Sequence, residues 1–363
     1  MTIELWEPSD LYELRTDPRM DAMPSYFLDT FFTATHFAGT EKIRFADLPE
    51  ADRFLAPFSL PYEQGKPIDW TQGESLESFL PPYIKLLNAV RPEEARNVKP
   101  SDIFRNRGQK PTLEERFDMR VKELVEKHLK AIKLREIWMA ARAFIDGQVL
   151  IEYERDQGVA NPNVLLNFGR DPGHTFTKTA DYWSDPDSDI LGDLEAWSNT
   201  MYLARRGGAP AQVIVGAQVA PVFRGNKGIK DMLDTNYRGG EEVVINRGIM
   251  NIERPMTRIG QLKTGLEIWT YKDTIDIPNG TGKTKVDLFN EKDVLLIAPG
   301  ANGVRAYGAI YDVDAVENGM SDVDIFQKMY KEDNPGARFI LSQSSPLPIP
   351  LNPNRTFKAR VLA

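Results

Sequence analysis

The stretch that decides the fold lies near the end of the chain and reads Arg338-Phe339-Ile340-Leu341-Ser342-Gln343-Ser344-Ser345-Pro346-Leu347-Pro348-Ile349-Pro350. It begins as a strand-like run, and a polar Gln-Ser-Ser step then leads into a stretch with proline at every second position. Proline favours an extended backbone and has no N–H to donate, so we expect this stretch at a sheet edge or in a connection. A second short strand, Lys358-Ala359-Arg360-Val361, closes the chain and indicates that the C-terminus is built into a sheet. The segment contains no catalytic group, so its role is architectural.

The clearest helix is expected over residues 112–146. Thr112 and Glu115 form a capping-box pattern after Pro111, and Gly147 supplies a stop signal. About 34 residues at 1.5 Å each predict a rod of roughly 50 Å. One stripe of the helix collects Phe117, Val121, Leu124, Val125, His128, Leu129 and Ile132. Acid-to-base pairs at i,i+4 spacing support it: Asp118–Lys122, Glu123–Lys127 and Glu126–Lys130.

Residues 48–110 are interrupted throughout by proline and glycine. Only short strand-like pieces lie between them, such as Ile68-Asp69-Trp70 and Tyr83-Ile84-Lys85. So long a segment with so little periodicity is unusual inside a compact domain. It suggests an extended hairpin that other chains stabilise.

The part after the helix reads as a mixed α/β region. Val149–Tyr153 and Val164–Phe168 predict a β-hairpin around Gln157-Gly158. Between 185 and 300 we expect a further hairpin, in which the strands Leu266–Ile275 and Val286–Ile297 flank the turn Pro278-Asn279-Gly280-Thr281-Gly282. The other elements expected there are helices at Asp187–Asn199 and Pro221–Asp234 and a strand at Gln212–Val215.

Composition excludes several classes of protein. The 363 residues include no cysteine and three histidines, which rules out disulfides and thiolate metal sites and leaves little for a histidine metal centre. No apolar run approaches the ~20 residues of a membrane span, and the N-terminus lacks a signal-peptide pattern. The net charge of −8 suits a surface that does not grip nucleic-acid phosphates, although many enzymes are equally acidic.

The motifs that suggest chemistry are all weak. Gly282-Lys283-Thr284 resembles the end of a phosphate-binding loop, but the glycine required five positions earlier is Ile277. Asp185, Asp187 and Asp189 alternate as in a calcium loop, yet the later positions do not fit, and helix capping explains them. His174 stands alone in a turn-like stretch. Arg205-Arg206 and the scattered lysines form no basic patch with interleaved aromatic residues, which argues against specific nucleic-acid binding.

Together with three other stretches in the same order, the C-terminal segment resembles the lambda-type major capsid proteins of tailed phages, the capsid protein E family. The stretches are Pro24-Ser25-Tyr26-Phe27-Leu28-Asp29-Thr30-Phe31-Phe32, then Val164-Leu165-Leu166-Asn167-Phe168 after the long helix, and Gly303-Val304-Arg305-Ala306-Tyr307-Gly308-Ala309-Ile310-Tyr311-Asp312-Val313-Asp314-Ala315. The resemblance implies the Hong Kong 97-type capsid fold, an α+β fold. Its expected parts are an N-terminal arm (1–47), an extended E-loop hairpin (48–110), a peripheral domain (111–184, with the spine helix at 112–146), an axial domain (185–315), and a return to the peripheral domain with the C-terminal strands (316–363).

The resemblance further implies a structural protein without catalytic residues, cofactor or metal. It would assemble in the host cytoplasm into hexamers and pentamers of an icosahedral head and become part of the virion. The head would enclose double-stranded DNA without sequence-specific binding, and the expected partners are scaffold, portal and decoration proteins. Two alternatives stay open, an encapsulin-like nanocompartment shell and a cytoplasmic α/β enzyme. The aromatic residues expected to contact neighbouring subunits are Phe27, Phe31, Phe32, Trp70, Phe79 and Tyr83. For the first three, packing inside the chain's own domain is an equally open expectation.

Overall fold

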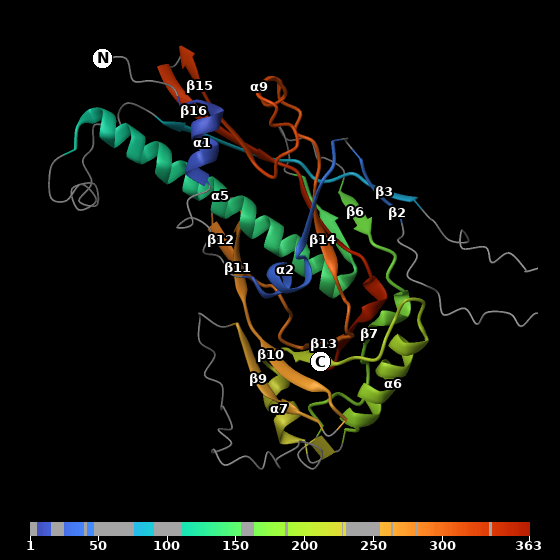
Figure 1. Ribbon diagram of the computed structural model, residues 1–363. Helices are drawn as coiled ribbons and strands as arrows, with labels where there is room; N and C mark the ends of the chain where they lie inside the picture. The colour runs from blue at the N-terminus through green and yellow to red at the C-terminus, as the bar shows by residue number, and fades with distance from the viewer. Residues whose placement is uncertain are drawn as a thin grey trace, which may run out of the picture.

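One long helix, α5 (Leu113–Asp146), organises the upper half of the molecule (Figure 1). Its ends follow from the sequence as expected. Thr112 Oγ1 accepts a hydrogen bond from the Glu115 backbone N–H at 3.2 Å, and Glu115 Oε2 accepts one from the Thr112 N–H at 2.8 Å. Gly147 ends the helix in the left-handed region with φ 66°. This computed structural model describes residues 6–15, 25–39, 42–46, 76–90, 111–153, 163–185, 188–226, 228–229, 255–262, 264–279, 282–333 and 336–363.

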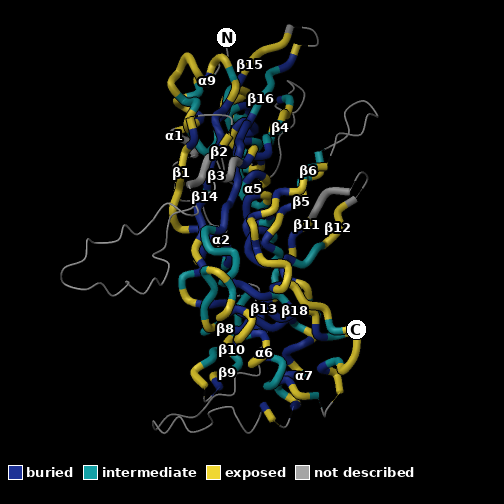
Figure 2. Tube along the Cα trace, turned by 90° about the vertical axis from the view of Figure 1, so that its right-hand side faces the viewer, coloured by how far each residue is buried: buried dark blue, intermediate teal, exposed yellow. Residues whose placement is uncertain are grey.

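The apolar stripe of α5 is buried as the sequence predicts. Its first half packs Phe117, Val121 and Val125 against Met329 and Ile340. Its second half enters the largest core of the chain, and the buried interior follows the helix in Figure 2. The predicted ion pair Glu123–Lys127 forms at 3.3 Å. Asp118, expected to pair with Lys122, accepts a hydrogen bond from Trp6 Nε1 at 3.2 Å.

Two three-stranded sheets lie beside α5. One is antiparallel, with the order β15-β16-β4 (Phe326–Asp333, Gly336–Ser344 and Ile84–Val90). Part of the expected E-loop, β4, is therefore paired with β16 of its own chain. The other sheet has the order β1-β14-β17 (Ala34–Phe37, Gly303–Tyr307 and Pro346–Pro350). The proline-spaced β17 lies at an edge of this sheet, as predicted.

Three two-stranded ribbons extend from this framework. The hairpin predicted after α5 is present as β5 with β6 (Gln148–Ile151 and Val164–Asn167). The hairpin predicted at the glycine-rich turn is β11 with β12 (Thr274–Asn279 and Gly282–Asp287). The third ribbon pairs β2 with β3 (Ile43–Ala46 and Leu76–Phe79).

The lower half of the molecule is built on a six-stranded sheet, shown below α5 in Figure 1. Helices α6 (Ile190–Leu203) and α7 (Val219–Gly225) pack on it around a second core that includes Trp183, Trp197 and Phe223. The strands, in sheet order, are β7 (Thr175–Thr177), β18 (Thr356–Arg360), β13 (Asp293–Ile297), β8 (Gln212–Val215), β10 (Glu267–Tyr271) and β9 (Met256–Gln261).

This sheet crosses the expected domain boundaries. The C-terminal strand β18 was expected with the peripheral domain, but it pairs with β13, which belongs to the range expected to form the axial domain. β7, from the range 111–184, pairs with β18. Strand pairing between residues far apart in the chain leaves no local sequence pattern, so these two strands could not be assigned in advance.

The remaining short elements complete the described chain. They are helix α1 (Pro8–Arg15), helix α2 (Tyr26–Phe31), helix α9 (Val313–Glu317) and the 3-10 helices η1 (Pro172–His174) and η2 (Pro353–Arg355). The helix predicted at Pro221–Asp234 corresponds to α7, which ends at Gly225, and most of its expected second half lies outside the described residues.

Candidate functional site: surfaces for subunit contact

The residues whose motifs suggested catalysis or ligand binding serve structural roles. Asp189 caps α6 by accepting a hydrogen bond from the Gly192 N–H at 2.9 Å, as the capping interpretation predicts. His174 is fully buried, its Nδ1 lies 3.0 Å from the Thr356 carbonyl oxygen, and burial lowers the pKa of its imidazole. Lys283 and Thr284 lie within strand β12 of a hairpin, which is not the setting of a phosphate-binding loop. Across the described part of the chain, no group of three His, Asp or Glu side chains is arranged to hold a metal ion.

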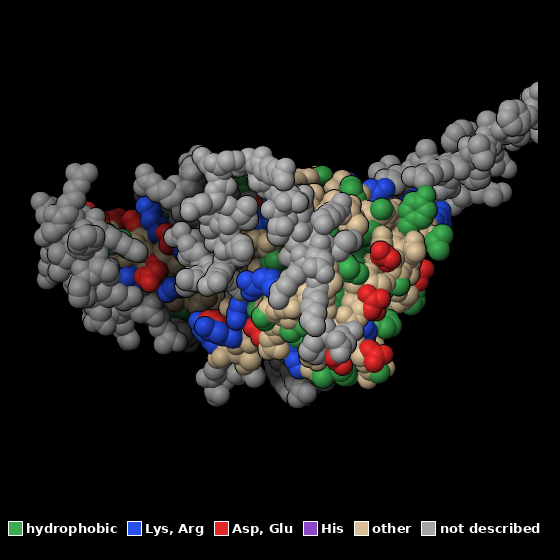
Figure 3. Space-filling model, turned by 90° about the horizontal axis from the view of Figure 1, so that it is seen from below, with side chains coloured by type: hydrophobic (Ala, Val, Ile, Leu, Met, Phe, Trp, Pro, Cys, Tyr) green, Lys and Arg blue, Asp and Glu red, His purple; other side chains and the backbone are tan. Residues whose placement is uncertain are grey.

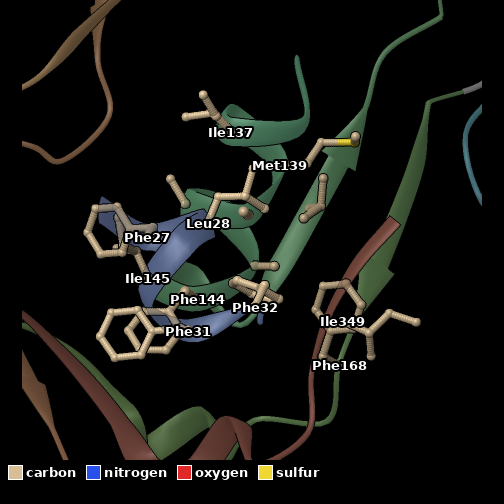
Figure 4. Packing of buried hydrophobic residues seen from close by; sticks show 14 of the residues in the cluster. Phe27, Leu28, Phe31, Phe32, Ile137, Met139, Phe144, Ile145, Phe168 and Ile349 are labelled. Carbon is tan, nitrogen blue, oxygen red and sulfur yellow. The ribbon is translucent and has the colours of Figure 1, made fainter. Parts of the chain in front are cut away.

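Three of the predicted contact residues are part of the chain's own core. Phe27, Phe31 and Phe32 on and after α2 are buried against the C-terminal part of α5 (Figure 4). Phe31 stacks on Phe144 with ring centroids 4.1 Å apart. These side chains have almost no surface left for a neighbouring subunit in this conformation. Their burial corresponds to the alternative that α2 packs inside its own domain.

Arg305 of β14 fixes α2 in this position. Its guanidinium donates to the carbonyl oxygens of Phe32 at 2.6 Å and Leu28 at 3.0 Å, which lie at the C-terminal end of the short helix. It also pairs with Asp29 at 2.9 Å. The α2 part of the expected arm is thus bound to the body of the molecule by charge and by aromatic packing.

The other predicted contact residues differ in their exposure. Phe79 is buried, and its ring centroid lies 5.4 Å from that of Phe168. Tyr83 is partly exposed, its hydroxyl donates to Gln343 Oε1 at 2.7 Å, and burial raises its pKa. Trp70 lies outside the described residues. Of this set, Tyr83 keeps surface that a neighbour could contact.

The most prominent exposed apolar surface surrounds α9. Tyr311, Val313 and Val316 are 61%, 71% and 64% exposed, while Ala315 on the same helix is fully buried. We call these three exposed side chains the α9 knob. It lies at the opposite end of the molecule from α6 and α7 (Figure 1). Exposed apolar clusters of this kind mark contact sites for other proteins.

A charge cluster anchors the α9 knob to the sheet beneath it. Lys328 Nζ of β15 lies 2.7 Å from both Asp312 Oδ1 and Asp314 Oδ2, and Gln343 Nε2 donates to Asp312 Oδ2 at 2.6 Å. Burial alone would raise the pKa of Asp312, but the hydrogen bonds from Lys328 and Gln343 outweigh it and lower that pKa. Desolvation alone would lower the pKa of Lys328, but its hydrogen bonds to Asp312 and Asp314 outweigh it and raise that pKa. Both groups therefore stay charged at neutral pH and hold the knob in place.

Two smaller apolar surfaces lie elsewhere. Leu150 and Leu165 are exposed cross-strand partners on the β5–β6 hairpin. Tyr202 and Leu203 are exposed at the end of α6. The face seen from below in Figure 3 mixes hydrophobic and charged side chains. Sequence patterns did not mark the exposed residues of the α9 knob or of these two smaller surfaces as contact residues. For the knob, the apolar positions on both sides of Asp314 could have indicated a short helix with an unburied face.

Comparison with known proteins then assigns the family. The sequence model of "Phage major capsid protein E" matches residues 18–361, nearly the whole chain. The chain belongs to this family. Curated relatives include the major capsid proteins of Escherichia phage lambda (23% identical, covering 90% of this chain and 91% of the relative) and Escherichia phage N15 (25% identical, with the same coverage). A further relative is the major capsid protein of Enterobacteria phage phi80 (25% identical, covering 88% of this chain and 89% of the relative).

The fold agrees with this assignment. The crystal structure of a prophage capsid protein from Escherichia coli CFT073 superposes with a TM-score of 0.66 at 18% identity, covering 99% of this chain and all of that chain. As a member of this family, the protein is a phage major capsid protein, a structural component of the virion. This confirms the sequence-based prediction and favours it over the encapsulin-like and enzyme alternatives. No helix in the described part of the chain is long and apolar enough to cross a membrane.

Proposed function

We propose that this capsid protein assembles into hexamers and pentamers of a closed icosahedral head that encloses double-stranded DNA, and that the α9 knob is one of its subunit contacts. The observation that carries the proposal is the exposure of Tyr311, Val313 and Val316 on a support fixed by Lys328. Water contact with three apolar side chains is unfavourable, and a neighbouring subunit that covers them gains about 25 cal/mol for each Å² buried.

Modest contacts are sufficient for such a shell. A head repeats the same contacts around every capsomer, so many weak interactions act together. The Leu150–Leu165 pair and the end of α6 supply further apolar surface at separate places on the chain. Contacts of this size can adjust between five-fold and six-fold surroundings without a change of fold.

The structure changes which parts of the expected arm and E-loop we propose as subunit contacts. The arm contributes docked segments, because α2 is fixed to α5 and β14, Leu11 of α1 is buried in a core, and β1 is paired with β14. Subunit contacts of residues 1–47 therefore use the surface that these docked elements leave exposed. The expected E-loop (48–110) is proposed to reach an adjacent subunit on the strength of the family resemblance, while β3 and β4 within it are paired with β2 and β16 of their own chain. Scaffold, portal and decoration proteins are proposed partners on the strength of the family resemblance.

Electron microscopy of the purified protein tests the proposal. Closed shells of tens of nanometres are expected, and nuclease-protected double-stranded DNA is expected in particles from infected cells. Small compact oligomers under all conditions would contradict shell assembly. Shells that protect a protein cargo and no DNA would favour an encapsulin-like function.

A further inference from the structure

One face of α5 gathers basic side chains in a chain whose net charge is −8. The positions follow the spacing of a single helix face, so their side chains line up along the rod. We call this set the basic face of α5: Lys127, Lys130, Ala131, Leu134, Arg135, Trp138 and Arg142. It contains four cations and no carboxylate.

The charges of this face are only partly compensated. Lys127 is paired with Glu123 at 3.3 Å, and Arg142 with Asp146 at 3.3 Å. Lys130 and Arg135 are exposed and have no carboxylate partner within the described ranges. Asp146 is also shared with Lys358 at 2.7 Å, which weakens its hold on Arg142.

Two further acids of α5, Glu136 and Glu126, lie outside this face. Glu136 is buried on the other side of the helix, where its Oε1 accepts a hydrogen bond from the Tyr307 hydroxyl at 2.8 Å. Lys133 Nζ lies 3.7 Å from the other Glu136 oxygen, and the partly exposed Glu126 lies beside Lys133 on the helix, next to the basic face. The face therefore keeps a positive charge.

The apolar members of the face are already used inside the chain. Leu134 and Trp138 are partly buried and pack against the main core. The guanidinium carbons of Arg135 and Arg142 lie 5.6 and 5.9 Å from the Trp138 ring centroid. The ring thus supports two arginine side chains and offers little apolar surface to a partner. A protein partner would need aromatic or aliphatic anchors that this face lacks, whereas phosphate groups need only the charges.

We propose that the basic face of α5 binds the sugar–phosphate backbone of the enclosed duplex DNA without sequence preference. From Lys127 to Arg142 the helix rises about 22 Å, which compares with about six phosphates of one DNA strand at 3.4 Å each. The inference rests on the proposed enclosure of DNA and names the surface that meets it. Because few phosphates are engaged and the rest of the chain is acidic, the contact is weak and leaves the DNA releasable.

The test compares two double variants of the full chain as unassembled subunits. Lys130→Gln with Arg135→Gln removes the two unpaired cations, and Lys283→Gln with Lys285→Gln removes two exposed lysines of β12 as the matched control. The probe is a fluorescent 20-base-pair duplex, titrated across a series of salt concentrations. Log affinity falls linearly with log salt concentration, with a slope of about −0.9 for each phosphate contacted. Removing two cations should therefore make the slope of the α5 variant less negative by about 1.8. The control should keep the slope of the natural protein.

Shell formation by the same proteins separates this inference from the proposed function. Both variants should form shells that look natural in electron microscopy. An α5 variant that binds DNA with unchanged slope overturns the inference, as does a natural subunit with no measurable affinity at low salt. If the α5 variant lost shell formation but bound DNA with unchanged affinity, the basic face would contact a second copy of the chain, and the DNA-binding inference would be overturned too. Failure of the natural protein to form shells contradicts the proposed function alone.

Discussion

At the scale of single residues, Gly147 controls how α5 joins the β5–β6 hairpin. Its φ of 66° suits glycine, and a Cβ added there would lie 2.7 Å from Arg170 Cβ and 2.9 Å from Arg170 Nε. Arg170 cannot easily move, because it is buried and donates to the Ile145 carbonyl and to Thr175 Oγ1, both at 2.6 Å. Burial lowers its pKa to about 10, so the guanidinium remains charged and needs these partners.

We expect Gly147→Val to destabilise the subunit and to reduce shell yield. Backbone strain alone costs about 1 kcal/mol or more, and the clash with Arg170 adds to it. Thermal unfolding and the yield of shells measure the effect. Gly265→Val is the matched control, because Gly265 has φ 87° with open space around it and would suffer only the backbone strain. Natural stability and yield in Gly147→Val would contradict the argument, and so would equal losses in the two variants.

For single residues, the sequence predicted the ends of α5 but not the packing partners of the aromatic residues near α2. The capping box at Thr112 and the stop at Gly147 were predictable, because both are local patterns with one structural solution. The destination of Phe27, Phe31 and Phe32 was not. An apolar side chain gains the same free energy by burial against its own chain as against a neighbour, so composition and spacing cannot separate the two.

At the scale of elements, His128 connects α5 to the sheet beside it. Its Nδ1 lies 2.8 Å from Ser342 Oγ on β16, and its Nε2 lies 2.8 Å from Asn88 Oδ1 on β4. Gln327 Nε2 donates to the same Ser342 oxygen at 2.9 Å, which leaves the serine proton for Nδ1. The network thus fits a neutral imidazole protonated at Nε2.

This junction should make the subunit sensitive to acid. Burial lowers the pKa of His128 below its ordinary value of 6.5. The folded state therefore binds the proton less readily than the unfolded state, so the stabilisation is complete above about pH 6.5 and is lost as pH falls from there to the folded-state pKa. We expect His128→Gln to reduce the drop in Tm of unassembled subunits between about pH 7.5 and pH 5.5. Some drop should remain, because burial also lowers the pKa of His174. An unchanged pH dependence in the variant would contradict the assignment.

Element prediction was most accurate for locally determined structure. β8 occupies the predicted residues 212–215, and both predicted hairpins are present. The two long apolar runs at 266–275 and 286–297 were each expected to be one strand, but each divides between the β11–β12 hairpin and the six-stranded sheet. Periodicity shows that a run is extended without showing which partner it pairs with, so the division depends on tertiary contacts.

At the scale of the whole molecule, we expect the shell to be held by noncovalent contacts. The chain has no cysteine, so no disulfide can link its copies. A lysine–asparagine isopeptide bond would need those two residues and a carboxylate together across a subunit boundary, and no such trio can be assigned from the sequence. Denaturing gel electrophoresis of mature particles should show one band near 41.1 kDa. A ladder of multimers that survives boiling would contradict this expectation.

The α9 knob gives the most direct test of assembly. Val313→Gln with Val316→Gln makes the knob polar without altering Asp312, Asp314 or Lys328. Both valines are exposed in the subunit, so the free energy of unfolding should change by no more than about 0.5 kcal/mol. In an assembled contact, each buried valine contributes up to about 1.5 kcal/mol, and the unpaired amides add a desolvation cost.

We therefore expect the double variant to fold with natural Tm and to lose shell formation. A loss of about 3 kcal/mol at one contact is a factor of about 100 in its affinity, and a shell repeats that loss at every copy. Sedimentation and electron microscopy measure the shells, and calorimetry measures the fold. Leu113→Gln, which alters an exposed apolar residue at the start of α5, is the matched control and should assemble normally. Shells at natural yield from the double variant would remove the knob from the subunit contacts, whereas a lowered Tm would mean that the valines support the subunit itself.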